Sequence, residues 1–311
     1  MKLAFVFPGQ GSQAIGMMNG FAGHPVVREA FSKASAALGD DLWKLVEEGP
    51  AEALNLTTNT QPVMLSAGVA VYRAWLASGG AKPVVVAGHS LGEYTALVAA
   101  GALAFRDAVP LVRFRAQAMQ DAVPAGVGAM AAIMGGDDDA VAAACAEAAQ
   151  GQVVEPVNFN APGQIVIAGH REAVERAIAL AKQKGAKRGV LLPVSAPFHS
   201  SLLKPAADKL AARLAQVEFL APTIPVIHNV DVAEHAEPDA IRAALAQQAA
   251  NPVRWTATVR RMAELGVTHV VECGPGRVLA GMNKRIAEGI ESFALIDSDA
   301  INETLAVLKD A

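Results

Sequence analysis

In the first part of the chain, short apolar runs alternate with longer stretches in which apolar residues recur every three or four positions. The runs LAFVF at 3–7 and PVVVAG at 83–88 predict strands, and within the second we expect Val84–Ala87 to be buried. Helical periodicity is found up to about residue 77, from 91 onward and over 107–123. Apolar strands separated by helices predict an α/β fold, with a mainly parallel sheet covered on both faces.

The pattern changes near Gly126, where strands and helices follow one another in the order βαββαβ. The segments are 129–134 (strand), 137–150 (helix), 153–159 and 164–169 (strands), 171–185 (helix) and 189–194 (strand). This order is typical of the ferredoxin-like unit. The later runs IPVIHNV and THVVECGPG indicate strands that return to the large sheet. We therefore predict a small domain, residues 126–194, inserted into a large domain, residues 1–125 and 195–311, with a cleft between them.

Composition narrows the class of protein. A hydrophobic content of 52% and a charged content of 18% are typical of a globular protein. Apolar stretches stop short of the ~18 to 20 residues that span a bilayer, and the first run is too short for a signal peptide, so we expect a cytoplasmic protein. The net charge of -4 argues against a nucleic-acid partner. Cys145 and Cys273 fit neither a disulfide framework nor a zinc site, and we expect reduced, packed thiols.

The turn after the second apolar run reads Gly88-His89-Ser90-Leu91-Gly92, which fits G-x-S-x-G. In a nucleophile elbow this pattern joins a strand to a helix, and small flanking residues allow the backbone to bend and expose the serine hydroxyl. Here a strand precedes the turn and a helix follows it. We interpret Ser90 as a nucleophile, in preference to a serine in a glycine-rich connector.

A serine hydroxyl needs a base, because it is a poor nucleophile at neutral pH. Of the seven histidines, His199 follows the last strand of the small domain, at the point where the chain returns to the large domain beside the cleft. We favour it over His89, whose side chain should diverge from Ser90 on a sharp elbow. The aspartates between Ser90 and His199 fall at helix ends, where capping explains them. A serine–histidine dyad is therefore predicted, with the histidine oriented by a backbone carbonyl.

Arg115 lies on the apolar face of the helix over 107–123. It is spaced four residues from Leu111 and from Met119, whereas Arg113 lies on the polar face. A guanidinium group that faces inward needs an anion, because an unpaired buried charge is costly. Two partners fit: a nearby acidic side chain in a structural salt bridge, or a carboxylate on the substrate.

The glycine-rich loop FPGQGSQ at 7–13 follows the first strand and contains G-x-G-x-x-A. A dinucleotide site also needs an acidic residue at the end of a second strand about 20 positions later, but Glu29 lies in a stretch with helical spacing. Acyl transfer at a serine needs backbone N–H groups for the oxyanion. The N–H of Leu91, directly after the nucleophile, supplies one, and we expect the Gln10 N–H of this loop to supply the second.

Six motifs occur in one order: FPGQGSQ, GHSLGE, R-x-x-x-M-Q, NAPGQIVIAG, APFH and NPVRW. With them the chain resembles, nearly end to end, the malonyl-CoA:acyl-carrier-protein transacylases of fatty-acid synthesis. This resemblance implies an α/β-hydrolase-like large domain with a ferredoxin-like insert, and an acyltransferase without metal or redox cofactor. Such an enzyme moves malonyl from malonyl-CoA through a malonyl-serine to the pantetheine thiol of acyl carrier protein.

The resemblance also implies roles for individual residues. Those that fall on the reacting centre are Ser90 as nucleophile, His199 as base, Gln10 and Leu91 as oxyanion donors, and Arg115 as the ligand of the malonyl carboxylate. Those that match outer positions are Gln61 and Asn160, at polar positions near the active site and CoA, and Gln248, whose backbone carbonyl alone would hold the histidine. Leu91 and Phe198 match the malonyl-selective versions of their motifs.

Alternatives remain at the level of the reaction and the partner. A serine esterase or thioesterase shares the serine, the histidine and the oxyanion hole but needs no buried cation. A malonyl transferase of polyketide synthesis or of malonate decarboxylase fits as well, whereas a binding module leaves the elbow unexplained. Carrier proteins are acidic, so we expect a basic patch beside the cleft, with a solvated helix end as the alternative. The candidates are Lys184, Lys187, Arg188 and Lys204.

Overall fold

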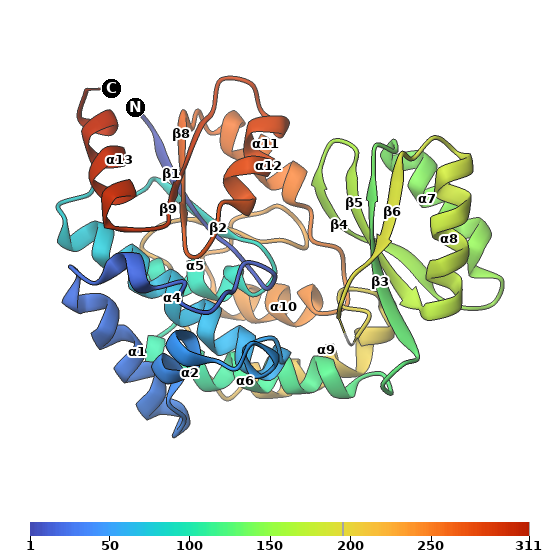
Figure 1. Ribbon diagram of the computed structural model, residues 1–311, viewed down its shortest axis with the longest axis horizontal. Helices are drawn as coiled ribbons and strands as arrows, with labels where there is room; N and C mark the ends of the chain where they lie inside the picture. Colours follow the sequence, from blue (N-terminus) through green and yellow to red (C-terminus); the bar gives the residue numbers. More distant parts are fainter. Residues whose placement is uncertain (195, 311) are drawn as a thin grey trace.

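The large sheet of the protein is parallel throughout. The computed structural model describes residues 1–194 and 196–310, and in it five strands are ordered β7-β2-β1-β8-β9 (Figure 1). Their bounds are Leu3–Phe7 (β1), Val85–Gly88 (β2), Val226–Ile227 (β7), His269–Cys273 (β8) and Glu291–Leu295 (β9). All four neighbouring pairs are parallel. The predicted α/β class with a mainly parallel large sheet is therefore confirmed.

Side chains of β1 alternate between two cores, because successive residues of a strand point to opposite faces. Phe5 and Phe7 pack into one core, and the Phe5 ring lies 5.5 Å from the Trp75 ring in an edge-on contact. Ala4 and Val6 pack into the other. Since helices cover both faces, every residue of β1 is buried, as the fully apolar run LAFVF predicts.

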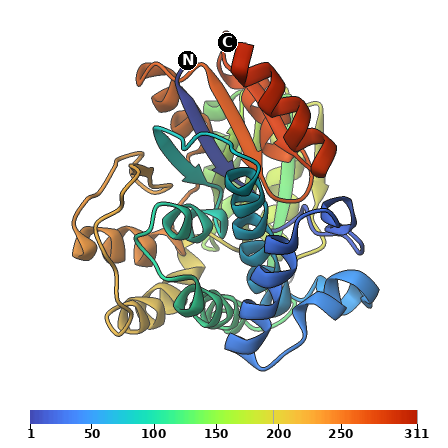
Figure 2. The ribbon, with the colours of Figure 1, turned by 90° about the vertical axis from the view of Figure 1, so that its left-hand side faces the viewer.

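Most helices belong to this larger unit. They are α1 (Pro25–Leu38), α2 (Leu42–Glu48), α3 (Ala51–Leu54), α4 (Thr57–Ala77), α5 (Gly92–Ala99), α6 (Phe105–Asp121), α9 (Lys204–Leu214), α10 (Pro238–Gln248), α11 (Trp255–Glu264), α12 (Val278–Ile286) and α13 (Ser298–Asp310), with short 3-10 turns at Asn19–Phe21 and Ser201–Leu203. Both chain termini lie at one end of the molecule (Figures 1 and 2). Because β1 starts there and its partners run parallel to it, the carboxyl ends of the strands all point away from the termini.

The smaller unit carries a second, antiparallel sheet with the order β4-β5-β3-β6. Its elements are β3 (Gly128–Met134), α7 (Asp138–Ala149), β4 (Val154–Ala161), β5 (Gln164–His170), α8 (Arg171–Gln183) and β6 (Arg188–Leu191). The element order is the predicted βαββαβ, and the strand order is that of a ferredoxin-like sheet. The limits of the two domains, at 125/126 and 194/195, stay a prediction.

The two units are joined by backbone pairing as well as by the chain itself. Val253 of the larger unit donates its N–H to Val157 O (2.8 Å) and accepts from Phe159 N–H (3.0 Å). In Figure 1, β4 is accordingly the strand of the small sheet that faces α11 and α12. The small sheet is thus attached to the larger unit through its edge strand β4.

Two details differ from the sequence prediction. Val84 is not buried: the strand begins at Val85, and Val84 is 48% exposed. The edge strand β9 does not follow from the apolar pattern, because four of its five residues are only partly buried or exposed.

Cys145 and Cys273 are buried free thiols, as expected. Among the described helices, none combines the length and apolar character that a membrane crossing requires.

Candidate active site

Ser90 lies at the tip of a strained turn between β2 and α5. Its φ of 52° is in the left-handed region, which L residues rarely adopt. The turn needs glycine on both sides: a Cβ on Gly88 would lie 1.8 Å from the Gly92 carbonyl carbon, and one on Gly92 would lie 2.0 Å from the Phe7 oxygen. The pattern G-x-S-x-G therefore follows from how closely the backbone of this turn approaches its surroundings.

His199 lies directly against the serine. Its Nε2 is 2.7 Å from Ser90 Oγ, and its Nδ1 is 2.8 Å from the backbone oxygen of Gln248. A carbonyl oxygen only accepts hydrogen bonds, so Nδ1 carries the proton and donates it. Nε2 then presents its lone pair to the Ser90 hydroxyl, which is the arrangement that a general base requires.

The histidine is held in its neutral form. Burial, and next the positive charge of Arg115, lower the pKa of His199 from 6.5 to about 3, against the opposing effect of the hydrogen bond to Gln248. His199 is only 4% exposed. At neutral pH its imidazole can therefore accept a proton from Ser90.

Arg115 is fully enclosed beside the serine, as its helical position predicts. It is 1% exposed, and burial lowers the pKa of its guanidinium. Nη1 donates to Gln61 Oε1 (2.8 Å), while Nη2 donates to Gln248 Oε1 (2.8 Å) and to Ser90 Oγ (3.1 Å). Within the described part of the chain, no carboxylate oxygen lies within 4.0 Å of its nitrogens. The structural salt bridge considered for Arg115 is thus not found among these residues.

The loop after β1 lies against the elbow. A Cβ on Gly9 would lie 2.6 Å from the His89 oxygen, which leaves room only for glycine at this contact. Next to it, Gln10 Oε1 accepts from Thr57 Oγ1 (2.7 Å), so the Gln10 side chain is turned toward α4. Leu91, the residue after the serine, is buried at the start of α5. Both expected oxyanion donors thus belong to segments that meet at the elbow.

A hollow of about 330 Å³ opens beside this loop. Its walls come from the Gln10 loop, from the start of α4, from α6 and from the segment after β6, and they comprise Gln10, Asn55, Leu56, Thr57, Gln120, Pro193 and Val194. The hollow therefore lies between the two units, where the sequence predicts a cleft.

Asn160 reaches the elbow from the small unit. Its Oδ1 lies 2.8 Å from His89 Nε2, and its side chain is buried. His89 therefore faces the small sheet, away from the dyad, as expected for neighbouring side chains on a sharp turn. Burial lowers the pKa of His89, so this imidazole also favours its neutral form.

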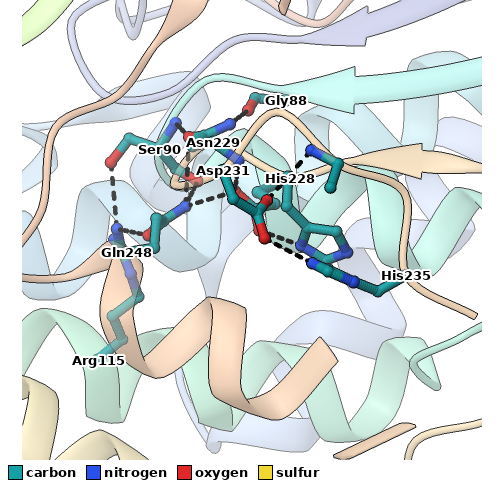
Figure 3. A network of polar contacts seen from close by, with 10 residues as sticks. Gly88, Ser90, Arg115, His228, Asn229, Asp231, His235 and Gln248 are labelled. Atoms are coloured by element: carbon teal, nitrogen blue, oxygen red, sulfur yellow. Dashed lines mark hydrogen bonds and ion pairs between the residues drawn. The ribbon is translucent and has the colours of Figure 1, made fainter. Parts of the chain in front are cut away.

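The structure adds three polar groups that the sequence analysis did not assign. Asn229, after β7, accepts the Ser90 N–H through Oδ1 (2.8 Å) and donates through Nδ2 to Gly88 O (2.7 Å). Glu93, in the first turn of α5, is fully buried and accepts the Asn229 N–H (3.0 Å). Gln248 contributes its side chain and not only its peptide group (Figure 3). GHSLGE and IHNV contain the first two residues, but neither motif shows that they meet.

Three of the basic candidates, Lys184, Lys187 and Arg188, lie on the small unit, whereas Lys204 begins α9 of the larger unit. Lys184 is paired with Glu147 (2.9 Å) and Lys204 with Asp208 (3.0 Å), so these two lysines already have carboxylate partners. Lys187 and Arg188 are both exposed, at the start of β6. This edge strand leads to Pro193 and Val194, which line the hollow.

Fold and site together define a class of α/β proteins in which a serine–histidine pair lies at the carboxyl edge of a parallel sheet, closed by a ferredoxin-like unit. Residues 4–304 match the family model of the acyl transferase domain. The chain belongs to this family, and the resemblance found in its motifs is confirmed.

Individual relatives match over nearly their whole length. The malonyl CoA-acyl carrier protein transacylase of Escherichia coli is 58% identical over 305 residues, 98% of this chain and 99% of the relative. The protein of that name from Bacillus subtilis is 44% identical, over 99% and 98%.

Solved structures agree with these relatives. The acyl-carrier-protein S-malonyltransferase of Burkholderia pseudomallei has a TM-score of 0.97 and 63% identity, over 98% of this chain and 100% of that one. The complex PlMCAT:AntF holds a type II PKS acyl-carrier protein with its malonyl-transacylase (TM-score 0.97, 52% identity, 99% and 100% covered).

Proposed function

We propose that the protein transfers the malonyl group from malonyl-CoA to the pantetheine thiol of acyl carrier protein, in the cytoplasm, and so supplies fatty-acid synthesis. The malonyl CoA-acyl carrier protein transacylases of Escherichia coli and Bacillus subtilis match over nearly the whole chain, and this similarity supports the assignment. The structural observation that carries it is Arg115, a buried guanidinium that donates to three neutral acceptors: the Ser90 hydroxyl (3.1 Å) and the amide oxygens of Gln61 and Gln248. A cation in this state suits an acyl group that ends in a carboxylate.

The first half of the reaction acylates the serine. Ser90 Oγ attacks the thioester carbonyl carbon while its proton passes to His199 Nε2, 2.7 Å away. The N–H groups of Gln10 and Leu91 stabilise the oxyanion. When the tetrahedral intermediate collapses, the C–S bond breaks, and His199 gives the proton to the departing sulfur of CoA. Malonyl-Ser90 and free CoA result.

The second half uses the same groups in reverse. His199 takes the proton of the pantetheine thiol, and the thiolate attacks the malonyl-Ser90 ester. The C–Oγ bond breaks, His199 returns the proton to Ser90, and malonyl-carrier protein leaves. The Gln248 carbonyl keeps Nδ1 protonated in both halves, so one tautomer of His199 serves throughout. These steps are proton transfer and acyl exchange, and they require no metal or redox cofactor.

Arg115 positions the substrate in this mechanism. A planar guanidinium binds a carboxylate through two parallel hydrogen bonds, which fixes the direction of the acyl chain as well as its charge. Gln61 and Gln248 hold the guanidinium without neutralising it. Asn160 and Gln61 remain candidates for further substrate contacts, and Leu91 and Phe198 for malonyl selectivity.

The carrier is proposed to approach along β6. Lys187 and Arg188 are exposed there, and the strand leads into the wall of the hollow. Acidic carrier proteins are attracted to such a surface, which mainly affects the association rate. A type II polyketide carrier is a second candidate partner, because PlMCAT, at 52% identity, forms a complex with one.

The decisive experiment follows the fate of the malonyl group. Malonyl-CoA alone should add one malonyl mass to the protein, and Ser90→Ala should abolish this adduct. With acyl carrier protein present the product should be malonyl-carrier protein. Free malonate as the main product in both reactions would identify a thioesterase instead, and an adduct that persists in Ser90→Ala would falsify the role of Ser90.

A further inference from the structure

The side chain of Gln248, the last residue of α10, lies at the centre of the polar cluster. It is fully buried. Its Nε2 donates to Ser90 O (2.8 Å) and to Glu93 Oε2 (3.0 Å), while its Oε1 accepts from Arg115 Nη2 (2.8 Å) (Figure 3). Together with the backbone contact to His199, one residue therefore contacts the nucleophile's backbone, the base and the guanidinium.

The surroundings of this carboxamide allow only one orientation. A backbone carbonyl and a carboxylate only accept hydrogen bonds, and a guanidinium only donates. With the amide turned over, its NH₂ group would face the NH₂ of Arg115, and its oxygen would face the oxygens of Ser90 and Glu93. The positions of Nε2 and Oε1 of Gln248 are thus fixed by the acceptors on one side of the carboxamide and the donor on the other.

Glu93, in the first turn of α5, holds the Gln248 carboxamide in this orientation. Its buried carboxylate receives three groups: His228 Nδ1 at 2.6 Å, the Asn229 N–H at 3.0 Å and Gln248 Nε2 at 3.0 Å. These contacts join the start of α5, the end of β7 and the end of α10. A carboxylate held from three directions cannot rotate, so the amide that binds to it is also held.

The Arg115 fork is supported at both ends by amide oxygens, Gln61 at Nη1 and Gln248 at Nη2. Neutral acceptors orient the guanidinium plane and leave its full charge for the substrate. We propose that the Gln248 carboxamide, anchored by Glu93, is a positioning group that presents Arg115 to the acyl carboxylate and so helps to set the preference for malonyl over uncharged acyl groups. This inference rests on the proposed function, in which Arg115 binds that carboxylate.

The test compares the acylation of Ser90 by malonyl-CoA and by acetyl-CoA in Gln248→Met. Methionine has a similar length and keeps the backbone carbonyl for His199, but it offers Arg115 no amide oxygen. Hydrogen bonds to charged groups contribute about 1.5–3 kcal/mol, so the malonyl-to-acetyl ratio of kcat/KM should fall roughly 10- to 100-fold. Gln247→Met, the same change on the exposed neighbour, should leave the ratio as it is.

An equal loss for both acyl groups would show a general structural role and overturn the proposal. Gln248→Asn, which keeps an amide but is one methylene too short to reach Arg115, should lower the ratio in the same direction. It provides the measurement if the methionine variant does not fold. CoA release reports acylation whether the acyl group then goes to a carrier or to water. Failure of carrier transfer is therefore distinguishable from failure of this inference.

Glu93→Gln separates amide orientation from charge. The new amide oxygen can accept from Gln248, while its NH₂ group can donate to His228 Nδ1 in the other imidazole tautomer. We expect the wild-type acyl ratio together with a lower Tm, because the buried network loses its ionic acceptor. A ratio that falls as far as in Gln248→Met would mean that the charge of Glu93, and not the fixed amide, sets the preference, and the proposal would be wrong.

Discussion

Arg115 Nη2 lies 3.1 Å from Ser90 Oγ, so the cation contacts the reacting hydroxyl itself. The guanidinium can only donate, and the serine oxygen therefore accepts from it and directs its own proton to His199 Nε2. The same charge lowers the pKa of His199. A single buried residue thus orients the nucleophile, keeps the base neutral and is available to a substrate carboxylate.

The lowered pKa of His199 predicts an unusual acid limb in the pH–rate profile of acylation. The rate should fall only at a pH well below the range in which a histidine ordinarily titrates. Protonation abolishes its function as a base, and with a pKa of about 3 this occurs far below the ordinary 6.5. Acylation by acetyl-CoA should thus be insensitive to His199 as the pH falls from neutral to about 5. In Arg115→Ala one cause of the shift is gone, so the limb should move to higher pH. Rapid-mixing measurements of CoA release against pH test both, and a wild-type limb near 6.5 would contradict them.

The same shift affects the stability of the fold. The unfolded chain binds a proton at His199 near pH 6.5, whereas the folded protein does not until about pH 3. Between these values acid favours the unfolded state, so the free energy of unfolding should fall as the pH decreases. His199→Ala should show a shallower slope in this window, measured by urea unfolding at several pH values.

Most of the fold and the reacting residues follow from local sequence signals. Ser90 and Arg115 are recognisable because a turn pattern and a helical period each fix their surroundings. Strand β9 gives a weaker signal, since Leu295 alone of its five residues is buried. The side-chain role of Gln248 could not be read at all, because its partners lie 133 to 158 positions away.

The glycines of the elbow give a prediction for stability. Gly92→Ala places a Cβ 2.0 Å from the Phe7 oxygen, a backbone atom that cannot move aside. We expect a loss of at least roughly 1–3 kcal/mol in the free energy of unfolding, the usual range for overpacking, together with a loss of acylation. Gly281→Ala is the matched control, since its Cβ would meet nothing within 4 Å on helix α12. It should stabilise by about 0.4–1 kcal/mol. Similar effects of the two changes would contradict the steric account of the elbow.

Charge reversal tests the carrier surface. The double variant Lys187→Glu with Arg188→Glu should raise the KM for acyl carrier protein and leave the KM for malonyl-CoA unchanged, because in the proposed docking it is the acidic carrier that contacts this edge strand. Lys33→Glu on α1, which lies on the opposite side of the molecule from the small unit in Figure 1, serves as the control. The defect should diminish as salt is added, since exposed charges are screened. If both KM values rise together, the patch is not specific to the carrier.

Arg115→Ala is the change that separates this protein from a general acyl hydrolase. Without the guanidinium, the malonyl carboxylate would be buried among Gln61, Gln248 and apolar side chains with no cation. Removing one partner of such a pair costs about 2–5 kcal/mol, which corresponds to a fall of roughly 30- to several-thousand-fold in kcat/KM for malonyl-CoA. Acetyl has no carboxylate to leave unpaired, so acylation by acetyl-CoA should be kept or increased, and the preference should invert.

Arg115→Lys refines this test, because it keeps the charge and removes the fork. A lysine ammonium is a point charge and cannot hold two parallel hydrogen bonds to a carboxylate. It also cannot reach both Gln61 and Gln248 in the way that Nη1 and Nη2 do. We therefore expect Arg115→Lys to recover only part of the malonyl preference lost in Arg115→Ala. Parallel measurement of kcat/KM for malonyl-CoA and acetyl-CoA in both variants decides the matter: if the two substrates fall by the same factor, Arg115 supports the fold of the site and does not select the acyl group.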